Sequence, residues 1–189
     1  MPARGDDPRR PLSLQLADYA KAKIWVVHRL DAATSGVLVF AKDMAAHKRL
    51  SGAFEGRTAK KTYLAAVLGA LEDGHSDAPL KTFGSGRVGP SPEGKPSETS
   101  WRVLERLREA TLLEVSPKTG RRHQIRVHLN AVGHPVLGDR RYGRARPVGG
   151  EPRLMLHAWK LELPGADGAP LKLSAPPPPD FEAVLTARR

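Results

Sequence analysis

The chain has 189 residues, enough for one domain with a substantial hydrophobic core, and it shows no internal repeat. It has no cysteine, which excludes disulfide bonds, thiolate zinc sites and iron–sulfur clusters. The 31 lysine and arginine residues outnumber the 20 aspartate and glutamate residues, and the formal net charge of +11 favours polyanions such as nucleic acid as partners. A basic composition can also be a habit of a whole proteome, so charge alone does not decide the partner.

The N-terminal region is polar. The first ten residues, MPARGDDPRR, lack the apolar core of a signal peptide, and no window of the chain is apolar enough to span a membrane. We therefore expect a soluble, cytoplasmic and monomeric protein without a membrane partner. Residues 1–13 contain prolines and few apolar side chains, which predicts an extended arm.

Local patterns predict the elements of the first half of the chain. In chain order these are a short helix over residues 11–23, strands at IWVV and VLVFAK, a helix over residues 44–54 and a strand at KKTYLAAVLG. Asp43 is expected to cap the start of the second helix, and Gly56 to end it. Residues 72–97 are rich in Gly, Pro, Asp and Ser, which predicts a loop or a weak hairpin.

The second half is expected to contain one well-defined helix among strands. The predicted elements are strands at SWRVLERL and TLLEVS, a helix over residues 121–132, strands at RLMLHAWKLELPG and LKLSA, and a C-terminal helix from Asp180. Ile125, Leu129 and Val132 recur at helical spacing, and Thr119 is placed to cap the start. Strands in runs with few helices between them predict an α+β fold, a single domain over residues 1–189 on a mixed, mostly antiparallel sheet with a few flanking helices.

The loop HRLDAATSG lies between the first two predicted strands, so its polar side chains stand at a strand end, where a rigid scaffold can present them. Asp31 is its only acid. One interpretation is structural: Asp31 forms an Asx-turn or a helix cap, while Thr34 and Ser35 bond to loop backbone groups. The other is functional: a lone carboxylate acts as nucleophile or base on a sugar or a base without a metal. The loop by itself leaves both interpretations open.

The helix predicted over residues 121–132 carries Arg122 and Arg126 one turn apart. Its opening holds three further polar residues, Arg121, His123 and Gln124. Arginines near a helix N-terminus can bind phosphate or a carboxylate, and a solvated basic face is the alternative. The three histidines between residues 123 and 134 are spaced by five and six, which places no two on one helical face as metal ligands. We therefore expect no metal site.

Tyr63 follows Lys60 and Lys61 on a predicted strand. Tyrosines in strands mostly pack in the core or at a sheet edge. Beside a basic pair, the ring could instead stack on a nucleic-acid base. The strand pattern leaves both interpretations open.

Several segments in order resemble the motifs of the RluA-type pseudouridine synthases. HRLDAATSGVLVFAKD resembles their signature HRLDxxTSGLLLxAK, KKTYLAAVLG resembles a K-x-Y-x-A-x-V-x-G strand, and GKPSETSWRVLE a G-K-x-x-x-T segment. LLEVSPKTGRRHQIRVHLNAVGHPVLGDRRYG looks like the third motif of the family almost residue for residue, and RLMLHAWKL follows in the place of R-L-x-L-H-A-x-x-L. The resemblance extends from about residue 12 to the predicted C-terminal helix.

The resemblance implies a cofactor-free isomerase that converts a uridine of structured RNA into its C-glycoside, pseudouridine. It assigns catalysis to Asp31, which would attack the nucleotide or remove the C2′ proton of the sugar while the N1–C1′ bond breaks and C5 takes its place. Arg126 would pair with Asp31 and favour its ionised form in a site shielded from water. Tyr63 would lie on the target ring and help remove the C5 proton, and Leu156 would form a wall of the base pocket.

The resemblance also implies an RNA partner whose target uracil is flipped out of its stack, with Arg29 filling the gap. The residues expected to contact substrate or RNA are His28, Arg29, Thr34, Lys61, Arg121, Arg122, His123, Gln124 and Leu156. Short relatives without an extra domain act on ribosomal RNA, transfer RNA or both, so a structured RNA of either kind is the expected substrate. The surplus cations would bind its phosphates, and RNA shape would do most of the selecting.

The N-terminus departs from the family pattern. Relatives begin with a strand and a K-P-x-G turn that this sequence lacks, which could leave a sheet edge uncovered, and we expect RNA contacts from the catalytic domain itself, without an S4-type RNA-binding domain. A catalytically idle RNA-binding or ribosome-assembly module of the same fold is therefore the alternative to an active enzyme. Retention of Asp31, Tyr63 and Arg126 favours the enzyme. A glycosidase-like hydrolase is disfavoured because no second acid lies near Asp31 in the sequence.

Overall fold

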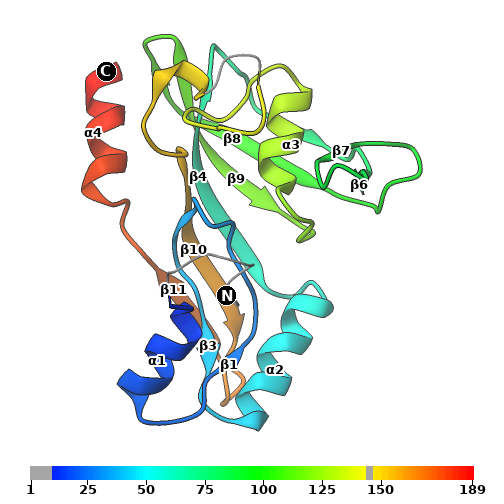
Figure 1. Cartoon of the computed structure of the whole chain (residues 1–189), viewed down its shortest axis with the longest axis vertical. Coiled ribbons are helices and arrows are strands. Elements are labelled where there is room, and N and C mark those ends of the chain that lie inside the picture. Colours follow the sequence, from blue (N-terminus) through cyan, green and yellow to red (C-terminus); the bar gives the residue numbers. More distant parts are fainter. Residues whose placement is uncertain (1–9, 144–146) are drawn as a thin grey trace. The chain divides into compact units, whose positions relative to one another are not determined.

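The computed structural model describes residues 10–143 and 147–189, which form two compact units (Figure 1). The first unit contains the residues up to Leu30 together with Leu38–Ala59 and Glu162–Lys172, and the remaining residues form the second. The chain passes from one unit to the other at five places, so neither unit is a contiguous segment. The single domain expected over residues 1–189 stays a prediction.

The first unit holds two helices and a two-stranded ribbon. Its elements are α1 (Leu12–Ala20), β1 (Trp25–Val26), β3 (Phe40–Ala41) and α2 (Met44–Glu55), with β1 and β3 antiparallel. The predicted cap of α2 is confirmed, because Oδ1 of Asp43 accepts the backbone N–H of Ala46 at 2.7 Å. Gly56 is the last residue of that helical turn, as expected.

Two expectations for this part of the chain are wrong in detail. The extended arm expected over residues 1–13 does not include Leu12 and Ser13, which already lie in α1, while residues 1–9 lie outside the described residues. The two predicted strands are also shorter than their apolar runs. Between β1 and β3 the chain enters the second unit, where β2 (Ser35–Gly36) pairs with β10 (Leu156–Pro164).

Most of the second unit's strands belong to one sheet with the strand order β11-β10-β4-β9-β8-β5, of which residues 162–164 of β10 and 170–172 of β11 fall in the first unit. These strands are β4 (Lys60–Leu68), β5 (Gly74–Ser76), β8 (Thr99–Leu107), β9 (Ala110–Pro117), β10 (Leu156–Pro164) and β11 (Pro170–Ser174). The pairs β4–β9, β8–β9 and β5–β8 are antiparallel, whereas β2 lies parallel to β10. The sheet is therefore mixed and mostly antiparallel, which confirms the predicted α+β class.

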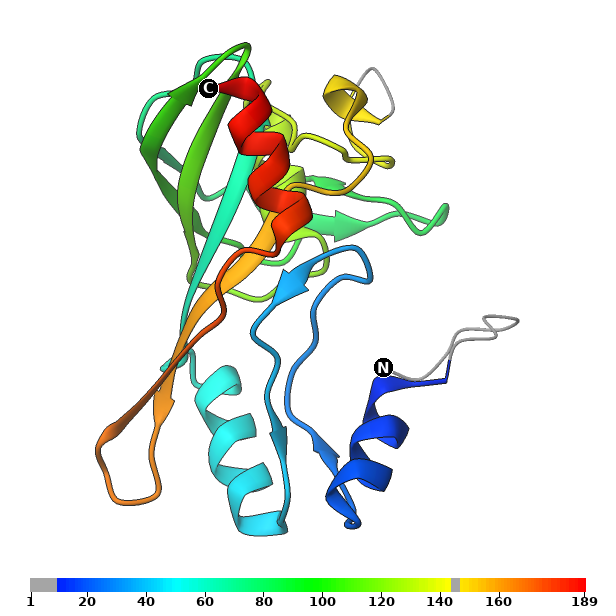
Figure 2. The ribbon, with the colours of Figure 1, turned by 90° about the vertical axis from the view of Figure 1, so that its left-hand side faces the viewer.

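Two helices cover this sheet. α3 (Gln124–Ala131) and α4 (Pro179–Arg188) lie on opposite sides of β4 and β10 (Figures 1 and 2). Residues 64–67 of β4 are all buried, as expected for a strand covered on both faces. The core that they enter also receives Leu129 from α3 and Phe181 from α4. Packing of both helices thus depends on the same central strand.

The segment 72–97, predicted as a loop or a weak hairpin, forms three short strands. β5 joins the edge of the main sheet, while β6 (Leu80–Thr82) and β7 (Val88–Pro90) pair as a separate hairpin. Leu80 and Val88 form a small buried cluster with Val127 and Tyr142, so the hairpin packs against α3. In the part of the chain that the structure describes, no helix has the length and apolar character needed to cross a membrane.

Candidate active site

The turn that carries Asp31 is held against β10 by backbone contacts. The N–H of Thr34 donates to the carbonyl of Asp31 at 2.9 Å and closes the turn, and the N–H of Val37 donates to the carbonyl of Ala158 at 2.9 Å. Gly36 between them has φ +116°, and a β-carbon there would overlap the carbonyl of Ala158. Only glycine combines this backbone conformation with so close an approach. The glycine of the TSG sequence thus sets where the Asp31 turn ends.

A partly buried series of hydrogen bonds holds the Ser35 side chain beside this turn. The Oγ of Ser35 accepts from Nη2 of Arg153 at 2.7 Å and lies 2.9 Å from Nδ1 of His157. Because Nε2 of His157 faces a carbonyl, which can only accept, the tautomer with its proton on Nε2 fits this place, and Nδ1 then accepts the proton of the Ser35 hydroxyl. Nε2 of His157 then donates to the carbonyl of Ala175 at 3.0 Å. The series links the Asp31 turn, β10 and the connection to α4.

One oxygen of Asp31 pairs with Arg126. Nη1 of Arg126 donates to Oδ2 of Asp31 at 3.1 Å, and the Asp31 side chain is only 18 % exposed. The same guanidinium donates through Nε and Nη2 to the two carboxylate oxygens of Asp139, at 2.7 and 2.9 Å. Asp139 is fully buried and also accepts the backbone N–H groups of Arg141 and Tyr142, at 2.7 and 3.0 Å. Arg126 is therefore held in a fixed orientation between two carboxylates.

The charges of this group are mutually stabilised. Burial opposes the charge of Asp139, but the hydrogen bonds from Arg126 and from two backbone N–H groups outweigh it and lower the pKa of the carboxyl group. Burial also opposes the charge of Arg126, yet its bonds to Asp139 and its attraction to both carboxylates raise the pKa of the guanidinium. The bidentate geometry is the strong form of an arginine–carboxylate pair.

The other oxygen of Asp31 faces His123. Oδ1 of Asp31 lies 3.9 Å from Nε2 of His123, which is longer than a hydrogen bond. Nδ1 of His123 lies 2.8 Å from the hydroxyl of Tyr142. Burial lowers the pKa of His123, and the nearby arginines 126, 122 and 141 lower it further, although Asp31 acts in the opposite direction. The imidazole is therefore neutral near pH 7, and Oδ1 is the less constrained oxygen of the carboxylate.

Tyr63 lies on β4 close enough to Asp31 to respond to its charge. Burial and then the Asp31 carboxylate raise the pKa of the Tyr63 phenol to about 12. The phenol is therefore protonated at neutral pH. The structure thus brings together the three residues expected to be catalytic, Asp31, Tyr63 and Arg126, whose roles stay predictions.

The residues expected to contact RNA at the start of α3 have different surroundings. Gln124 is buried, and its side chain bonds to Thr119, Thr99 and the backbone at 98 and 121, which uses its amide in packing the second unit. Arg121 donates to the carbonyl of Pro96 at 3.2 Å, and Arg122 donates to that of Gly86.

The start of α3 differs from its prediction. The helix begins at Gln124 and not at residue 121, with His123 in the left-handed conformation at its N-cap. Thr119 is not the cap, because its hydroxyl donates to Oε1 of Gln124 at 2.6 Å. Arg122 therefore precedes the helix, and the expected pair of Arg122 and Arg126 on one helical face is wrong. A helical periodicity fixes the apolar face but not the first residue that adopts helical dihedral angles.

Three other predicted contact residues lie in the second unit. Nζ of Lys61 donates to the carbonyl of Thr119 at 3.0 Å, and burial lowers the pKa of this lysine. The Oγ1 atom of Thr34 is buried and has no hydrogen-bond partner among the residues that the structure describes. Leu156 is buried in the core at the start of β10.

His28 and Arg29 belong to the first unit. Nε2 of His28 accepts the backbone N–H of Val39 at 3.0 Å, and its ring stacks on Phe54 with centroids 4.5 Å apart. Arg29 is exposed. The proposed RNA contacts of these two residues stay predictions.

Sequence reasoning missed two residues that hold the site, Asp139 and Tyr142. Both lie in the GDRRYG stretch, which the family resemblance includes but to which no role was given. An acid followed by two arginines has the pattern of a solvated charged turn. The fully buried carboxylate of Asp139 and the buried ring of Tyr142 depend on tertiary contacts with α3 and the β6–β7 hairpin.

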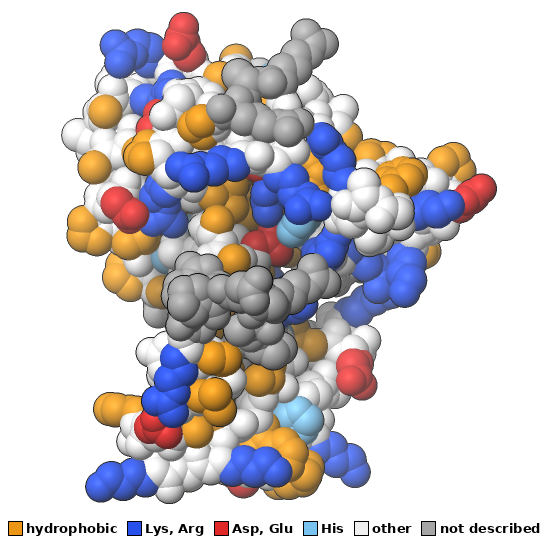
Figure 3. All heavy atoms as spheres, in the orientation of Figure 1, with side chains coloured by type: hydrophobic (Ala, Val, Ile, Leu, Met, Phe, Trp, Pro, Cys, Tyr) orange, Lys and Arg blue, Asp and Glu red, His pale blue; other side chains and the backbone are white. Residues whose placement is uncertain are grey.

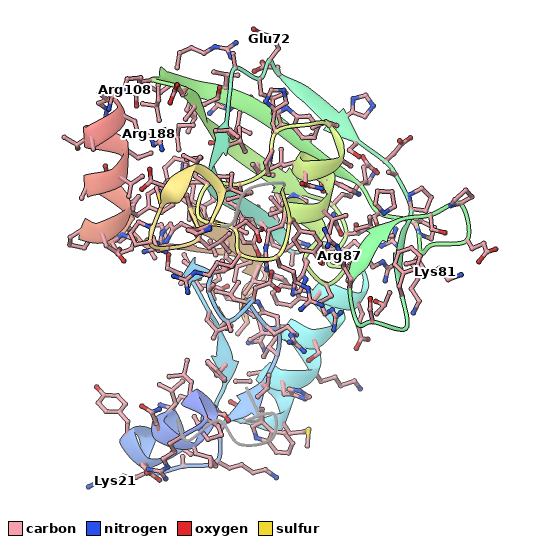
Figure 4. All side chains as sticks on the ribbon, turned by 45° about the horizontal axis from the view of Figure 1, so that its top comes forward. Lys21, Glu72, Lys81, Arg87, Arg108 and Arg188 are labelled. Atoms are coloured by element: carbon pink, nitrogen blue, oxygen red, sulfur yellow. The ribbon has the colours of Figure 1, made fainter. Side chains whose placement is uncertain are left out.

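Cations gather around this part of the second unit. Lysine and arginine side chains cluster on the face that carries α3 and the β6–β7 hairpin (Figure 3), and Lys81 and Arg87 lie on that hairpin (Figure 4). The carbonyl of Gly86 in the hairpin loop accepts from Arg122 and, at 2.8 Å, from Arg141. Arginines anchored in this way present a dense positive charge, which attracts a phosphate backbone.

The arrangement is suited to carboxylate chemistry. Asp31 offers one oxygen held by Arg126 and one without a hydrogen bond to that arginine, next to a protonated phenol. Such a carboxylate can act as a nucleophile or as a base. The described residues include no cluster of three or more side chains that could hold a metal ion.

Comparisons with known proteins give consistent results. Residues 4–131 match the family described as RNA pseudouridylate synthase. The chain is 45% identical to ribosomal large subunit pseudouridine synthase D of Nitrosomonas europaea over 186 residues, which are 93% of this chain and 54% of that protein. It is 40% identical to the dual-specificity RNA pseudouridine synthase RluA of Haemophilus influenzae over 142 residues, which are 72% of this chain and 65% of that protein. The chain thus spans about half the length of most of the curated relatives it matches.

The fold is shared with solved structures. Human RNA pseudouridylate synthase domain containing 1 superposes with a TM-score of 0.80 and 30% sequence identity, covering 91% of this chain and 78% of the human one. Human RNA pseudouridylate synthase domain containing 4 superposes with a TM-score of 0.76 and 26% identity.

Proposed function

The chain belongs to the RNA pseudouridylate synthase family, and on that premise we propose that it converts uridine into pseudouridine in RNA, with Asp31 as the reacting carboxylate. The single observation that carries the proposal is the position of Asp31. Its carboxylate is largely shielded from solvent, paired through one oxygen with Arg126, and close enough to the phenol of Tyr63 to raise its pKa.

The proposed reaction is an isomerisation that needs no other reactant. The N1–C1′ bond of uridine breaks, a C5–C1′ bond forms, C5 loses its proton and N1 gains one. Asp31 starts the sequence either by attacking the nucleotide or by removing the C2′ proton of the ribose. Both routes use a carboxylate oxygen with free lone pairs, which Oδ1 supplies because Arg126 bonds to Oδ2.

Tyr63 enters this reaction as a phenol. With its pKa raised to about 12, the hydroxyl stays protonated at pH 7. Because pH 7 lies about five units below this pKa, almost no phenolate is present to remove the C5 proton directly. The half-buried ring, which senses the charge of Asp31, can lie against a uracil, and its hydroxyl can donate a hydrogen bond. Stacking and donation are thus the roles that its protonation state favours.

The substrate that we propose is a structured ribosomal or transfer RNA. The relatives named above are a ribosomal large subunit synthase and a dual-specificity RNA synthase. The net charge of +11 and the cations near α3 and the β6–β7 hairpin support binding of phosphates on either side of the target. A paired uracil must leave its stack to reach Asp31, and the exposed Arg29 is our candidate to fill the gap.

Release of tritium from transcripts labelled at uracil C5 tests the proposal. We expect release into water with the purified chain, and a loss of at least about a thousandfold with Asp31→Asn, because the amide cannot act as nucleophile or base. Asp43→Asn is the matched control, since Asp43 caps α2 in the first unit. Tight RNA binding without release by the unchanged chain would instead indicate a binding or ribosome-assembly module, and free uracil among the products would indicate a hydrolase.

A further inference from the structure

Tyr142 and His123 form a pair next to Asp31 that the proposed reaction does not use. Nδ1 of His123 and the hydroxyl of Tyr142 are 2.8 Å apart, and the two rings meet edge to face with centroids 5.6 Å apart. Nε2, on the other side of the imidazole, faces Oδ1 of Asp31 at 3.9 Å. His123 also has φ +57°, a conformation that a residue with a side chain keeps only where its surroundings hold it.

The hydrogen bonds around Tyr142 favour one of the two nitrogens of His123 as the protonated one. The Tyr142 oxygen accepts the backbone N–H of Val88 at 3.4 Å, so the hydroxyl proton is available for donation. Among the described residues, Nδ1 of His123 is the acceptor within hydrogen-bond distance of this hydroxyl, and a proton on Nδ1 would leave the hydroxyl proton without that partner, which favours an unprotonated Nδ1. In the neutral imidazole the remaining proton is on Nε2 and points toward Asp31.

We propose that Tyr142 is a positioning residue that fixes His123 as the neutral Nε2–H tautomer and so directs a hydrogen-bond donor at the reactive oxygen of Asp31. The proposal rests on the proposed function for its kinetic consequences but not for the tautomer itself. The distance of 3.9 Å is longer than a hydrogen bond, so the donor contacts Oδ1 once substrate binding draws the two groups together.

A neutral donor at this place has a specific use. It orients Oδ1 and stabilises its negative charge without supplying a second full positive charge, which would reduce the reactivity of the carboxylate. The groups that face His123 are Asp31, Tyr142 and the arginines 126, 122 and 141, and the arginines oppose a charged imidazole. The hydrogen bond from Tyr142 acts in the same direction, because it occupies the lone pair that a second proton would need.

The tautomer is tested on the free protein by the nitrogen chemical shifts of the His123 ring. We expect the unchanged protein to show a protonated Nε2 and an unprotonated Nδ1, and Tyr142→Phe to show a mixture of tautomers. This substitution keeps the ring, and with it the packing of Arg126, whose Cζ lies 5.1 Å from the ring centroid. Tyr19→Phe is the matched control, because Tyr19 is 90 % exposed on α1.

Kinetics of tritium release test the consequence. We expect Tyr142→Phe to lower kcat about tenfold with little change in KM, and to move the acidic limb of the pH profile to higher pH, since Nδ1 becomes free to accept a proton. His123→Asn should lose about as much although Asn tolerates the left-handed backbone well, because its amide reaches only the place of Nδ1. His123→Gln places an amide N–H near the position of Nε2 and should retain more activity.

The outcomes separate this inference from the proposed function. An unchanged protein that releases no tritium contradicts the proposed function, while the ring shifts still decide the tautomer. An active protein whose Tyr142→Phe variant keeps the same tautomer and the same pH profile overturns the inference. The same holds if His123→Asn matches the unchanged protein in kcat.

Discussion

The two oxygens of Asp31 face regions that are built in different ways. On the side of Oδ2, Arg126 and the buried Asp139 form a charged group with four donor contacts to Asp139. On the side of Oδ1, His123 and Tyr142 form a neutral pair joined by one hydrogen bond, with a gap of 3.9 Å to the carboxylate. Both regions depend on the same short stretch of chain, residues 139–142.

The difference indicates how one carboxylate can be both fixed and reactive. A buried ion pair is rigid because removal of either partner leaves an uncompensated charge. A neutral pair with one hydrogen bond costs less to rearrange and leaves its oxygen available. We therefore expect substitutions on the charged side to affect stability and activity together, and those on the neutral side to affect mainly activity.

Asp139→Asn should have the largest effect on stability, because it leaves the buried guanidinium of Arg126 without its main counter-charge. We expect the free energy of unfolding to fall by about 3 kcal/mol and kcat to fall at least about a hundredfold. Urea unfolding and tritium release measure the two effects. A variant as stable as the unchanged protein would show that the charged side is not the rigid one.

Ser35→Ala removes the hydroxyl that links Arg153 and His157 beside the Asp31 turn. The variant leaves the buried His157 and the partly buried Arg153 each short of one partner, so we expect a loss of about 1 to 2 kcal/mol in unfolding free energy and a smaller loss of kcat than with Asp139→Asn. Calorimetry and single-turnover kinetics would check this order. Equal activity of the variant and the unchanged protein would exclude a part for Ser35 in holding the turn.

Asp31→Asn sharpens the comparison, because it removes the reacting group but leaves Arg126 with its two bonds to Asp139. We expect the free energy of unfolding to change by at most about 1 kcal/mol while tritium release disappears. Denaturant unfolding of this variant beside Asp139→Asn gives a direct contrast. A loss of unfolding free energy as large as that of Asp139→Asn would mean that Asp31 also stabilises the fold.

The neutral histidines of the folded protein, His123 among them, should make the free energy of unfolding depend on pH. Burial lowers the pKa of both His123 and His128 in the folded protein, so below about pH 6.5 the unfolded chain binds protons that the folded chain does not. The unfolding free energy should therefore decrease from pH 7 toward pH 5, whereas Asp139, with its lowered pKa, loses its contribution only below about pH 4. His123→Gln should make the decrease shallower. A stability that rises as the pH falls through this range would contradict the assignment.

The smallest effect is expected at a cross-strand ion pair of β8 and β9 that, among the residues that the structure describes, shares no hydrogen bond or ion pair with Asp31. Arg102 donates to both oxygens of Glu114 at 2.9 and 3.1 Å. Exposed pairs of this kind contribute little because water screens them. Arg102→Ala should leave the melting temperature and tritium release unchanged within error, and a clear loss of either would show that bidentate geometry outweighs exposure here.

Local patterns along the chain were sufficient for most elements. The helix cap at Asp43, the strands of KKTYLAAVLG and SWRVLERL and the C-terminal helix follow from side-chain chemistry within a few residues, and the structure confirms them. The start of α3 was predicted three residues early, since periodicity does not report backbone dihedral angles. Within residues 72–97 the β6–β7 hairpin agrees with the predicted weak hairpin, whereas β5 was not predicted because it pairs with β8, which is distant in sequence.

The sequence by itself determined the family and the fold class. It also indicated Asp31, Tyr63 and Arg126 as the candidate catalytic residues. Only the tertiary structure decided how Asp31 is held: the bond to Arg126 spans 95 positions in the chain, and that between Ser35 and His157 spans 122. The burial of Asp139 and the proton position on His123 also depend on which donors and acceptors remain unsatisfied after folding. That property belongs to the assembled core, because a hydrogen-bond partner is chosen by distance in space and not by order in the chain.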